Sequence, residues 1–285
     1  MIMKRFKHKK TVLLLLSFLI SGYTIEAQQF KPNTEIGILL GASYYLGDLN
    51  TVHFNQSSPA AGLVIRKNID KRFAYKAEIM YLNLRSDERD SDDTIAVSRG
   101  LHFRSPVYEL SGQVEFNFLP YDPGNPLYTW TPFVYGGVSI FNFNPQAENA
   151  ATNGEWVDLQ ALGTEGQGTT SFPERKKYSL IQFSAALGGG VKIAVSNIFN
   201  IIFEYSTRKT FTDYLDDVST TYPGGNLTDM APESIYMSDP VGASDPALLH
   251  AKGDQRGDPE KNDWYSFAGI TLSFKLANKT KGCDY

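Results

Sequence analysis

The stretch Tyr108-Glu-Leu-Ser-Gly-Gln-Val-Glu-Phe-Asn-Phe118 alternates between apolar and polar residues. The apolar residues are Leu110, Val114, Phe116 and Phe118. The polar residues between them are Glu109, Ser111, Gln113, Glu115 and Asn117. A period of two places these sets on opposite faces of a β-strand, because successive side chains point to opposite sides of a sheet. The sequence therefore predicts a strand here with one apolar face and one polar face.

The same period recurs in seven further segments of the chain. They are residues 35–46, 60–67, 72–84, 130–142, 178–195, 199–209 and 264–276. Strands of about 9–11 residues are long enough to cross a bilayer when they are tilted. Together with residues 108–118, these segments predict an all-β fold of eight strands.

The connections between the predicted strands alternate in length. The short ones are residues 68–71, 119–129 and 196–198, and the long ones are 47–59, 85–101, 143–177 and 210–263. Short periplasmic turns and long extracellular loops are typical of transmembrane β-barrels, as are aromatic residues at the strand ends. Those aromatic residues are Tyr44, Tyr45, Tyr81, Trp130, Phe141, Trp264 and Phe274. We therefore predict an eight-stranded antiparallel transmembrane β-barrel over residues 28–276.

A soluble two-sheet β-sandwich is the competing fold, because its strands also alternate. Its loops would have no reason to alternate between long and short. Secreted sandwiches often contain disulfides, and the single cysteine, Cys283, cannot form an internal one. These differences favour the barrel.

The first 27 residues have the order of a secretory signal peptide. Five basic residues lie within the first ten, an apolar run covers residues 11–20, and small and polar residues lead to Ala27. The apolar run is too short to span a bilayer as a helix, which needs about 20 apolar residues. We expect cleavage after Ala27 and localisation to the outer membrane. Residues 277–285 are expected to form a periplasmic tail, either as a disordered extension or as a contact for a partner.

The composition and the histidine positions argue against several function classes. The net charge is −4 and the basic run is confined to the first ten residues, so nucleic acid is not an expected partner. His53, His102 and His250 are scattered and lack metal-ligand spacing. Ser105 follows His102 by three positions, which places the two on opposite faces of a strand. We expect no enzymatic activity, no cofactor and no metal.

The acidic segment Thr212-Asp-Tyr-Leu-Asp-Asp217 invites a comparison with calcium-binding loops. It lacks the alternating carboxylates and the central glycine of such a loop. Asp residues are also common in turns, where their side chains bond the nearby backbone. The sequence therefore predicts a solvated acidic turn.

The polar strand faces should line the lumen if the apolar faces meet outer-membrane lipid. An eight-stranded barrel has an interior only just wide enough for side chains to fill, and an isolated buried charge is costly. Opposite charges inside it must therefore pair. We predict a lumenal ion-pair network of Lys76, Glu78, Glu109, Glu115, Lys192, Glu204 and Arg208, and a plugged lumen rather than a water channel.

Three stretches, at residues 44–50, 156–168 and 208–219, resemble the PorG-like family of Bacteroidota outer-membrane barrels. That family is associated with the type IX secretion system. The resemblance implies a non-enzymatic barrel of a protein secretion apparatus that contacts a periplasmic ring of partner proteins. It also implies that the motif residues pack the loops and close their turns. These residues are Gly47, Asp48, Asn50, Thr164, Glu165, Gly166, Asp213, Tyr214, Asp216 and Asp217.

A small outer-membrane barrel can also serve another role. The alternatives are a lipid-modifying enzyme, a minor pore and a surface-binding protein. An enzyme would need a nucleophile and a base placed together at the membrane rim. The charged lumenal face disfavours the pore.

Overall fold

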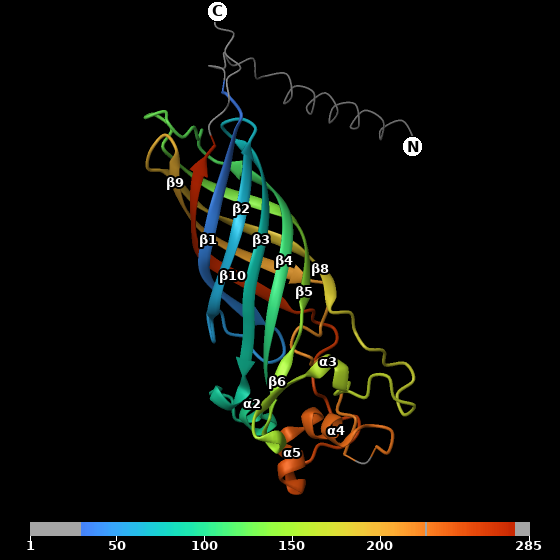
Figure 1. Cartoon of the computed structure of the whole chain (residues 1–285). Helices are drawn as coiled ribbons and strands as arrows, with labels where there is room; N and C mark the ends of the chain where they lie inside the picture. Colours follow the sequence, from blue (N-terminus) through green and yellow to red (C-terminus); the bar gives the residue numbers. More distant parts are fainter. Residues whose placement is uncertain (1–29, 226, 277–285) are drawn as a thin grey trace, which may run out of the picture. The chain divides into compact units, whose positions relative to one another are not determined.

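The computed structural model describes residues 30–225 and 227–276 (Figure 1). The chain divides into a unit of residues 1–31 and a unit of residues 32–285, and the barrel belongs to the second. The predicted signal peptide at residues 1–27 and the predicted tail at residues 277–285 both lie outside the described residues.

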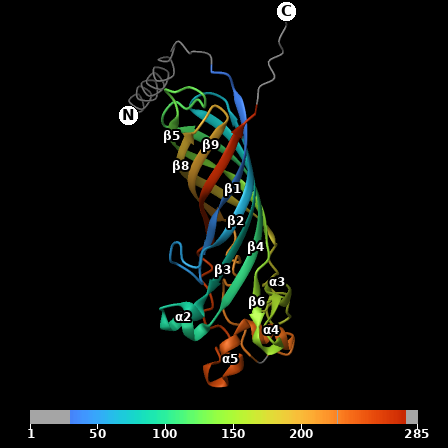
Figure 2. The ribbon, with the colours of Figure 1, turned by 60° about the vertical axis from the view of Figure 1, so that its left-hand side comes forward.

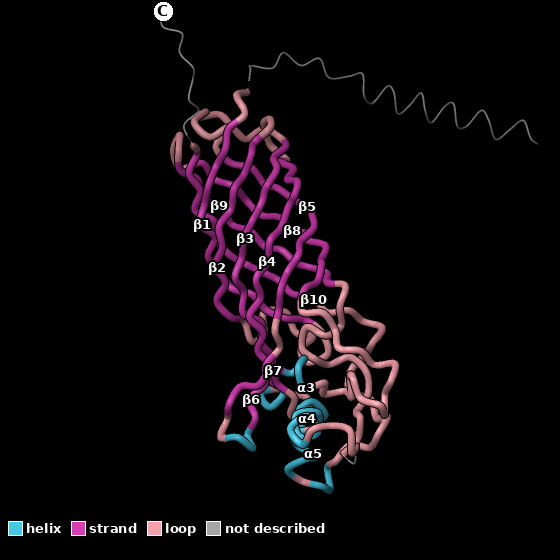
Figure 3. The backbone as a smooth tube through the Cα atoms, turned by 45° about the vertical axis from the view of Figure 1, so that its right-hand side comes forward, coloured by secondary structure: helices cyan, strands magenta, loops and turns pink. Residues whose placement is uncertain are grey.

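Eight strands form the barrel. They are β1 (Asn33–Leu46), β2 (Ser58–Asn68), β3 (Phe73–Asp87), β4 (His102–Asn117), β5 (Trp130–Phe143), β8 (Ile181–Ala194), β9 (Phe199–Thr210) and β10 (Trp264–Lys275). Neighbours pair antiparallel in the order β1-β2-β3-β4-β5-β8-β9-β10, and β10 pairs with β1 to close the cylinder. The prediction of an eight-stranded antiparallel barrel is confirmed (Figures 1 and 3).

The hairpin of β3 and β4 extends beyond the end of the barrel, because these two strands stay paired after their outer neighbours have ended. β3 and β4 stay paired up to Asp87 and His102. β2 leaves β3 at Leu82, and β5 leaves β4 at Val107. The fourth strand therefore begins at His102, several residues before the start expected from its alternating pattern. The extra length carries the hairpin beyond the barrel into the loops.

The outward face of the barrel is apolar. Its exposed side chains include Ile36, Ile38, Leu40, Leu63, Ile65, Ile79, Leu110, Val114, Val138, Phe183, Leu187, Phe203, Ile270 and Leu272. A continuous exposed apolar band around a closed barrel is the surface that meets lipid. The barrel therefore spans a membrane, and the band is called the apolar belt below.

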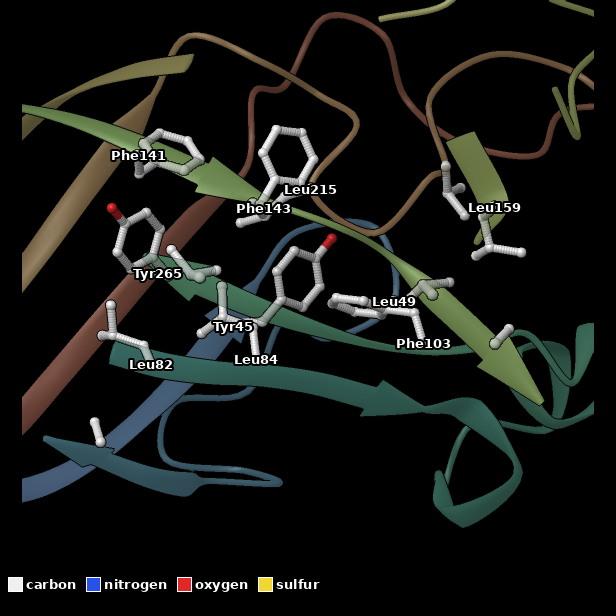
Figure 4. Packing of buried hydrophobic residues seen from close by; sticks show 14 of the residues in the cluster. Tyr45, Leu49, Leu82, Leu84, Phe103, Phe141, Phe143, Leu159, Leu215 and Tyr265 are labelled. Atoms are coloured by element: carbon white, nitrogen blue, oxygen red, sulfur yellow. The ribbon is translucent and has the colours of Figure 1, made fainter. Parts of the chain in front are cut away.

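Four of the aromatic residues expected at the membrane interfaces do point outward, three of them at or next to strand ends and Tyr81 in the middle of β3. They are Tyr81, Trp130, Trp264 and Phe274. The prediction is wrong for Tyr45 and Phe141, which are 0% and 1% exposed and lie inside the barrel (Figure 4). Tyr44 is buried beneath His53 and Phe54. Tyr45 and Phe141 point inward because they belong to an apolar core at one end of the barrel.

The two ends of the barrel differ as predicted. The connections at residues 69–72, 118–129 and 195–198 are short and define the turn end. The connections at residues 47–57, 88–101, 144–180 and 211–263 define the loop end, and the last three of them are longer than any connection at the turn end. The first residue of β1 and the last residue of β10 both lie at the turn end, since Glu35 pairs with Lys275.

The long connections fold into a cap on the loop end (Figures 1 and 3). Its elements are η1 (Glu88–Asp90), α2 (Thr94–Arg99), β6 (Gln146–Asn149), η2 (Ala150–Thr152), β7 (Glu155–Asp158), α3 (Leu159–Leu162), α4 (Pro232–Ser238), α5 (Pro240–Ser244) and η3 (Pro246–Leu248). In the described part of the chain, no helix combines the length and the apolar character needed to cross a membrane.

An apolar core joins the cap to the barrel (Figure 4). The strands contribute Leu82, Leu84, Phe103, Phe141, Phe143 and Tyr265, and the long connections contribute Leu49, Leu159 and Leu215. Each fully buried aliphatic or aromatic side chain contributes about 1.5–3 kcal/mol to stability. Residues from loops far apart in sequence therefore hold the cap as an ordered layer over the loop end.

Candidate functional site: a filled lumen beneath a polar cap

Glu115 is the centre of the charge network inside the barrel. Its carboxylate lies 2.7 Å from Nε of Arg66, 2.5 Å from Nζ of Lys192 and 3.8 Å from Nζ of Lys76. All four side chains are at most 1% exposed. Three cations thus converge on one carboxylate from β2, β3 and β8.

Lys76 and Arg208 extend the network toward the loop end. Nζ of Lys76 lies 2.8 Å from Glu78 and 3.0 Å from Glu204. The Arg208 guanidinium lies 3.0 Å from Glu109 and 3.8 Å from Glu78. The structure therefore brings together all seven residues predicted to pair in the lumen.

Two members of the network, Arg66 and Glu35, were missed by the sequence analysis. Nη1 of Arg66 lies 3.3 Å from Glu35, and the Ser273 hydroxyl donates to the same carboxylate at 2.9 Å. The alternation of β2 could have revealed Arg66, because Val64 and Asn68 share its inward face. The network then contains five carboxylates and four cations, so charges of both signs fill the interior.

Aromatic rings complete the packing of the lumen. Nζ of Lys76 lies 3.7 Å from the ring centroid of Tyr135. That ring has room because β8 carries Gly188, where a Cβ would sit 2.4 Å from Cζ of Tyr135. At the turn end, Tyr121 is 2% exposed, and its backbone N–H donates to the carbonyl of Lys71 at 3.0 Å. The short connection at 118–129 thus closes against the barrel with a buried aromatic residue.

Glu165 holds the cap together from its buried position. Its carboxylate accepts hydrogen bonds from the backbone N–H groups of Ser219 at 2.9 Å and Thr220 at 3.1 Å, and from Arg256 at 3.1 Å. Gly166 follows it with φ +84, and a Cβ there would sit 2.5 Å from the Phe172 ring. The turn therefore needs glycine to aim Glu165 at the 211–263 connection.

Asp216 and Asp217 tie the same connection to the barrel and to the neighbouring loop. The Tyr45 hydroxyl donates to Asp216 at 2.5 Å and lies 2.9 Å from Asp263. Asp217 accepts from the Tyr178 hydroxyl at 2.6 Å and from the Thr164 hydroxyl. A strand-end tyrosine and two loop carboxylates therefore form one buried polar cluster.

The first long connection joins this cluster through its own motif residues. Asn50 donates from its side chain to the carbonyl of Tyr45 at 2.6 Å, and the Asp48 carboxylate accepts from the backbone N–H of Asp258 at 3.0 Å. A Cβ on Gly47 would sit 2.0 Å from the Tyr45 hydroxyl oxygen. The ten motif residues singled out by the resemblance thus come from three loops that meet in the cap.

The prediction of a solvated acidic turn at residues 212–217 is wrong. Asp213, Asp216 and Asp217 are 7%, 1% and 0% exposed. Tyr214 stacks on Tyr178 at 4.6 Å between ring centroids. The turn is buried because partners from the other loops cover it, and no pattern within the hexapeptide indicates those partners.

Burial raises the pKa values of several carboxyls in the cap. The pKa of Asp213 rises to about 8, mainly by loss of hydration, and a hydrogen bond from the Ser219 side chain offsets only part of this rise. The pKa of Asp217 rises to about 6, because desolvation outweighs the nearby Arg256. Burial and neighbouring acids raise the pKa values of Asp216 and Asp263 well above their usual range. At neutral pH the Asp213 carboxyl is therefore mostly protonated, whereas the Asp217 carboxyl is mostly ionised.

Ser105 and His102 each bond a different backbone N–H group of the 144–180 connection. Ser105 is buried on the inner face of β4, where its hydroxyl accepts from the backbone N–H of Asn144 at 3.1 Å. His102 accepts from the backbone N–H of Glu148 at 3.0 Å. Across residues 30–225 and 227–276, no three His, Cys, Asp or Glu side chains are grouped so that they could hold a metal ion.

A family model described as a domain of unknown function (DUF6089) matches residues 9–160, which is more than half of the chain. The chain belongs to that family. The matched residues include β1 to β5, the first two long connections, and the third long connection as far as β7. No curated protein matches the sequence.

Several solved outer-membrane proteins are similar to this family member in fold. OprG from Pseudomonas aeruginosa is 9% identical, with a TM-score of 0.43 over 89% of this chain and 100% of its own. Neisserial surface protein A is 8% identical, with a TM-score of 0.42 over 86% and 99%. The outer membrane enzyme PagL is 9% identical, with a TM-score of 0.30 over 86% and 99%.

Proposed function

We propose that this chain is a non-enzymatic outer-membrane barrel that serves a protein secretion apparatus of type IX as a structural and interaction component. The observation that supports this best is the lumen, where five carboxylates and four cations pair and leave the interior to the protein's own side chains. Because side chains occupy the lumen, the surfaces at the two ends of the barrel are the parts that can contact other proteins. The resemblance to the PorG-like family points to the secretion role.

The location in the outer membrane follows from the barrel and its apolar belt. Closed barrels satisfy every strand hydrogen bond without water, which is what a lipid environment requires. Short turns face the periplasm in bacterial outer-membrane barrels. We therefore place the turn end in the periplasm and the cap outside the cell.

The proposed periplasmic partners would meet the turn end. Its short connections expose apolar side chains, namely Ile69, Leu119, Leu127 and Ile198, of which Leu127 is 81% exposed. Exposed apolar side chains outside a lipid belt support contact with another protein. Residues 277–285 offer a second contact, since the chain leaves β10 at this end.

The proposal is tested by co-purification and by secretion. The full chain, expressed in a bacterium that has the type IX system, should co-purify in detergent with periplasmic ring proteins. The variant Leu127→Asp should recover less of the ring and secrete less cargo. The matched control is Leu248→Asp, which changes an exposed leucine of the cap.

Deletion of residues 277–285 separates the two expectations for the tail. Lower recovery of the ring and lower secretion indicate a contact, while unchanged values indicate a mere extension. If the intact barrel purifies alone and its loss leaves secretion unchanged, the secretion role is wrong.

A surface-binding role is the second candidate, and the cap supports it. A groove of about 680 Å³ lies between the first two long connections and residues 255–257 of the last one. Its acidic residues are Asp48, Asp87, Glu88, Asp90, Asp92 and Asp93. A barrel that binds external ligands should lose binding when the Asp90 and Asp92 charges are removed, without any change in secretion.

A further inference from the structure

A hollow of about 510 Å³ lies on the outside of the barrel, within the apolar belt. Figure 2 shows β1 to β4, the strands that carry most of it, side by side along the barrel wall. Its outward-facing side chains include Ile36, Ile65, Ala77, Ile79, Leu110 and Phe274. Glu78 also borders the hollow, but its carboxylate pairs with Lys76 inside the lumen. The hollow therefore presents apolar side chains to the membrane.

The register of the strands explains why the belt is hollowed at this place. One row of outward-facing neighbours, taken from β1 to β4, consists of Ile36, Ile65, Ala77 and Gly112. The next row toward the loop end consists of Ile38, Leu63, Ile79 and Leu110. The first row ends in two small residues, and a Cβ on Gly112 would have no atom within 4 Å. Ala77 and Gly112 therefore form a floor that lies below the larger side chains around it.

A polar row lies next to the hollow on its turn-end side. It consists of Thr34, Lys67 and Tyr75, which are cross-strand neighbours on β1, β2 and β3. Nζ of Lys67 lies 3.5 Å from Oγ1 of Thr34, and no carboxylate pairs with Lys67 among residues 30–225 and 227–276. Tyr75 is 60% exposed, and tyrosine favours the membrane interface. Since a strand rises about 3.3 Å per residue, this row lies about 7 Å from the floor of the hollow.

The acidic residues beside the polar row are directed elsewhere. Glu35 follows Thr34, but its carboxylate points into the lumen and pairs with Arg66. Asp70 lies in the turn after β2, where its carboxylate accepts from the backbone N–H groups of Arg72 at 2.6 Å and Phe73 at 2.8 Å. The Lys67 ammonium is therefore the charge that the row presents on the outside of the barrel.

We propose that the hollow and the polar row together bind one anionic glycerophospholipid. An acyl chain would lie in the hollow, because the hollow is part of the belt that meets lipid. The phosphate would accept a charge-assisted hydrogen bond from Lys67 and further ones from the hydroxyls of Thr34 and Tyr75. Both halves of the site lie on the same three strands, two residues apart, and this spacing matches a lipid that joins a phosphate to an acyl chain.

The proposal goes beyond the secretion role and does not depend on it. The test uses the full chain, purified in detergent and freed of bound lipid. Phosphatidylglycerol and a diacylglycerol with the same acyl chains are added at equal concentrations, and native mass spectrometry counts the bound molecules of each. The wild-type chain should bind one phosphatidylglycerol about fivefold more tightly than the diacylglycerol, since that is the effect of one lysine close to an anionic lipid.

Two variants separate the two halves of the site. Lys67→Gln should remove the preference for phosphatidylglycerol, and its matched control is Lys209→Gln, which changes an exposed lysine at the loop end of β9. Ala77→Leu should weaken the binding of both lipids, because the larger side chain fills the floor of the hollow. Its matched control is Ala185→Leu, at an outward-facing alanine of β8. Both controls should bind like the wild-type chain, and heat-dependent gel mobility verifies that each variant is folded.

Three results would overturn the proposal. The first is an unchanged preference for phosphatidylglycerol in the folded Lys67→Gln variant. The second is equal binding of phosphatidylglycerol and the diacylglycerol by the wild-type chain, which would reduce the hollow to an unselective part of the belt. The third is displacement of phosphatidylglycerol by millimolar glycerol phosphate, which would assign the polar row to a soluble phosphate.

Discussion

The lumen and the cap both bury carboxylates, but they neutralise them differently. In the lumen, each of the five glutamates has a cation or a hydrogen-bond donor within reach, and four cations supply most of the compensation. In the cap, Arg256 lies beside Glu165 and Asp217, while Asp213, Asp216 and Asp263 have raised pKa values. The lumen relies on ion pairs, whereas the cap combines the ion pairs of Arg256 with carboxyls whose pKa values are raised by burial.

The difference reflects where each region can find its partners. Lumenal residues come from long strands whose register fixes opposite charges across a narrow space. Cap residues come from loops, which meet through turns and hydrogen bonds to backbone N–H groups. Two effects lower the cost of burying a carboxylate that has no cation beside it. Backbone N–H groups can donate hydrogen bonds to it, and a proton can neutralise its negative charge. The cap should therefore respond to pH, whereas breaking the lumen requires a change of residue.

The largest expected effect is the removal of the central lumenal carboxylate. Glu115→Gln leaves Arg66, Lys76 and Lys192 without their shared partner, and loss of one member of a buried ion pair costs about 3–5 kcal/mol. The measurement is the urea midpoint for loss of the heat-modifiable form in vesicles. Glu155→Gln, at an exposed site in β7, is the matched control. Equal midpoints for the two variants would contradict the ion-paired lumen.

The next effect is on the cap alone. Arg256→Met removes the guanidinium that contacts Glu165 and the carbonyls of Ser238 and Asp217, which should destabilise the cap by about 2–4 kcal/mol. Limited proteolysis should then cut residues 211–263 faster, while the barrel keeps its heat-modifiable mobility. Lys176→Gln provides the control for loss of an exposed cationic side chain from the cap. Cooperative loss of the barrel together with the cap would show that the two regions are not separable.

A smaller effect is expected from pH. The pKa of Asp213 in the folded cap is about 8, above the value of 3.8 for an unfolded chain, so its contribution is complete below about pH 4 and is lost progressively as the pH rises from there to about 8. Proteolysis of the cap should accelerate across this range. Asp213→Asn should flatten the dependence and stabilise the cap at pH 9 by about 1–2 kcal/mol, a figure reduced for screening by nearby water. The same profile in both proteins would refute the role of Asp213.

The smallest expected signal is an ion current. The paired charges and the buried Tyr121 occupy the interior, so planar bilayers that contain the wild-type chain should show no large, steady conductance. Glu155→Gln should behave identically. A stable current like that of a porin would contradict the plugged lumen and favour the minor-pore alternative.

The sequence by itself determined the barrel. Strand alternation is local, so the faces of β4 were readable from Tyr108–Phe118 alone, and the lengths of the connections separated the turn end from the loop end. The lumenal pairs followed because any charge on an inward face of a narrow barrel needs an opposite one. Arg66 was missed only because the short segment around it was not divided into its two faces.

The tertiary structure decided the cap. The partners of Glu165 lie in another loop more than 50 residues away, and those of Asp216 include Tyr45, at the end of the first strand. No period links such positions, so the acidic turn looked solvated and Tyr45 and Phe141 looked like membrane-interface residues. Their burial depends on which loops come together above the barrel. That arrangement is fixed by packing and hydrogen bonds between distant segments, because no single loop contains all the groups that satisfy its buried carboxyls.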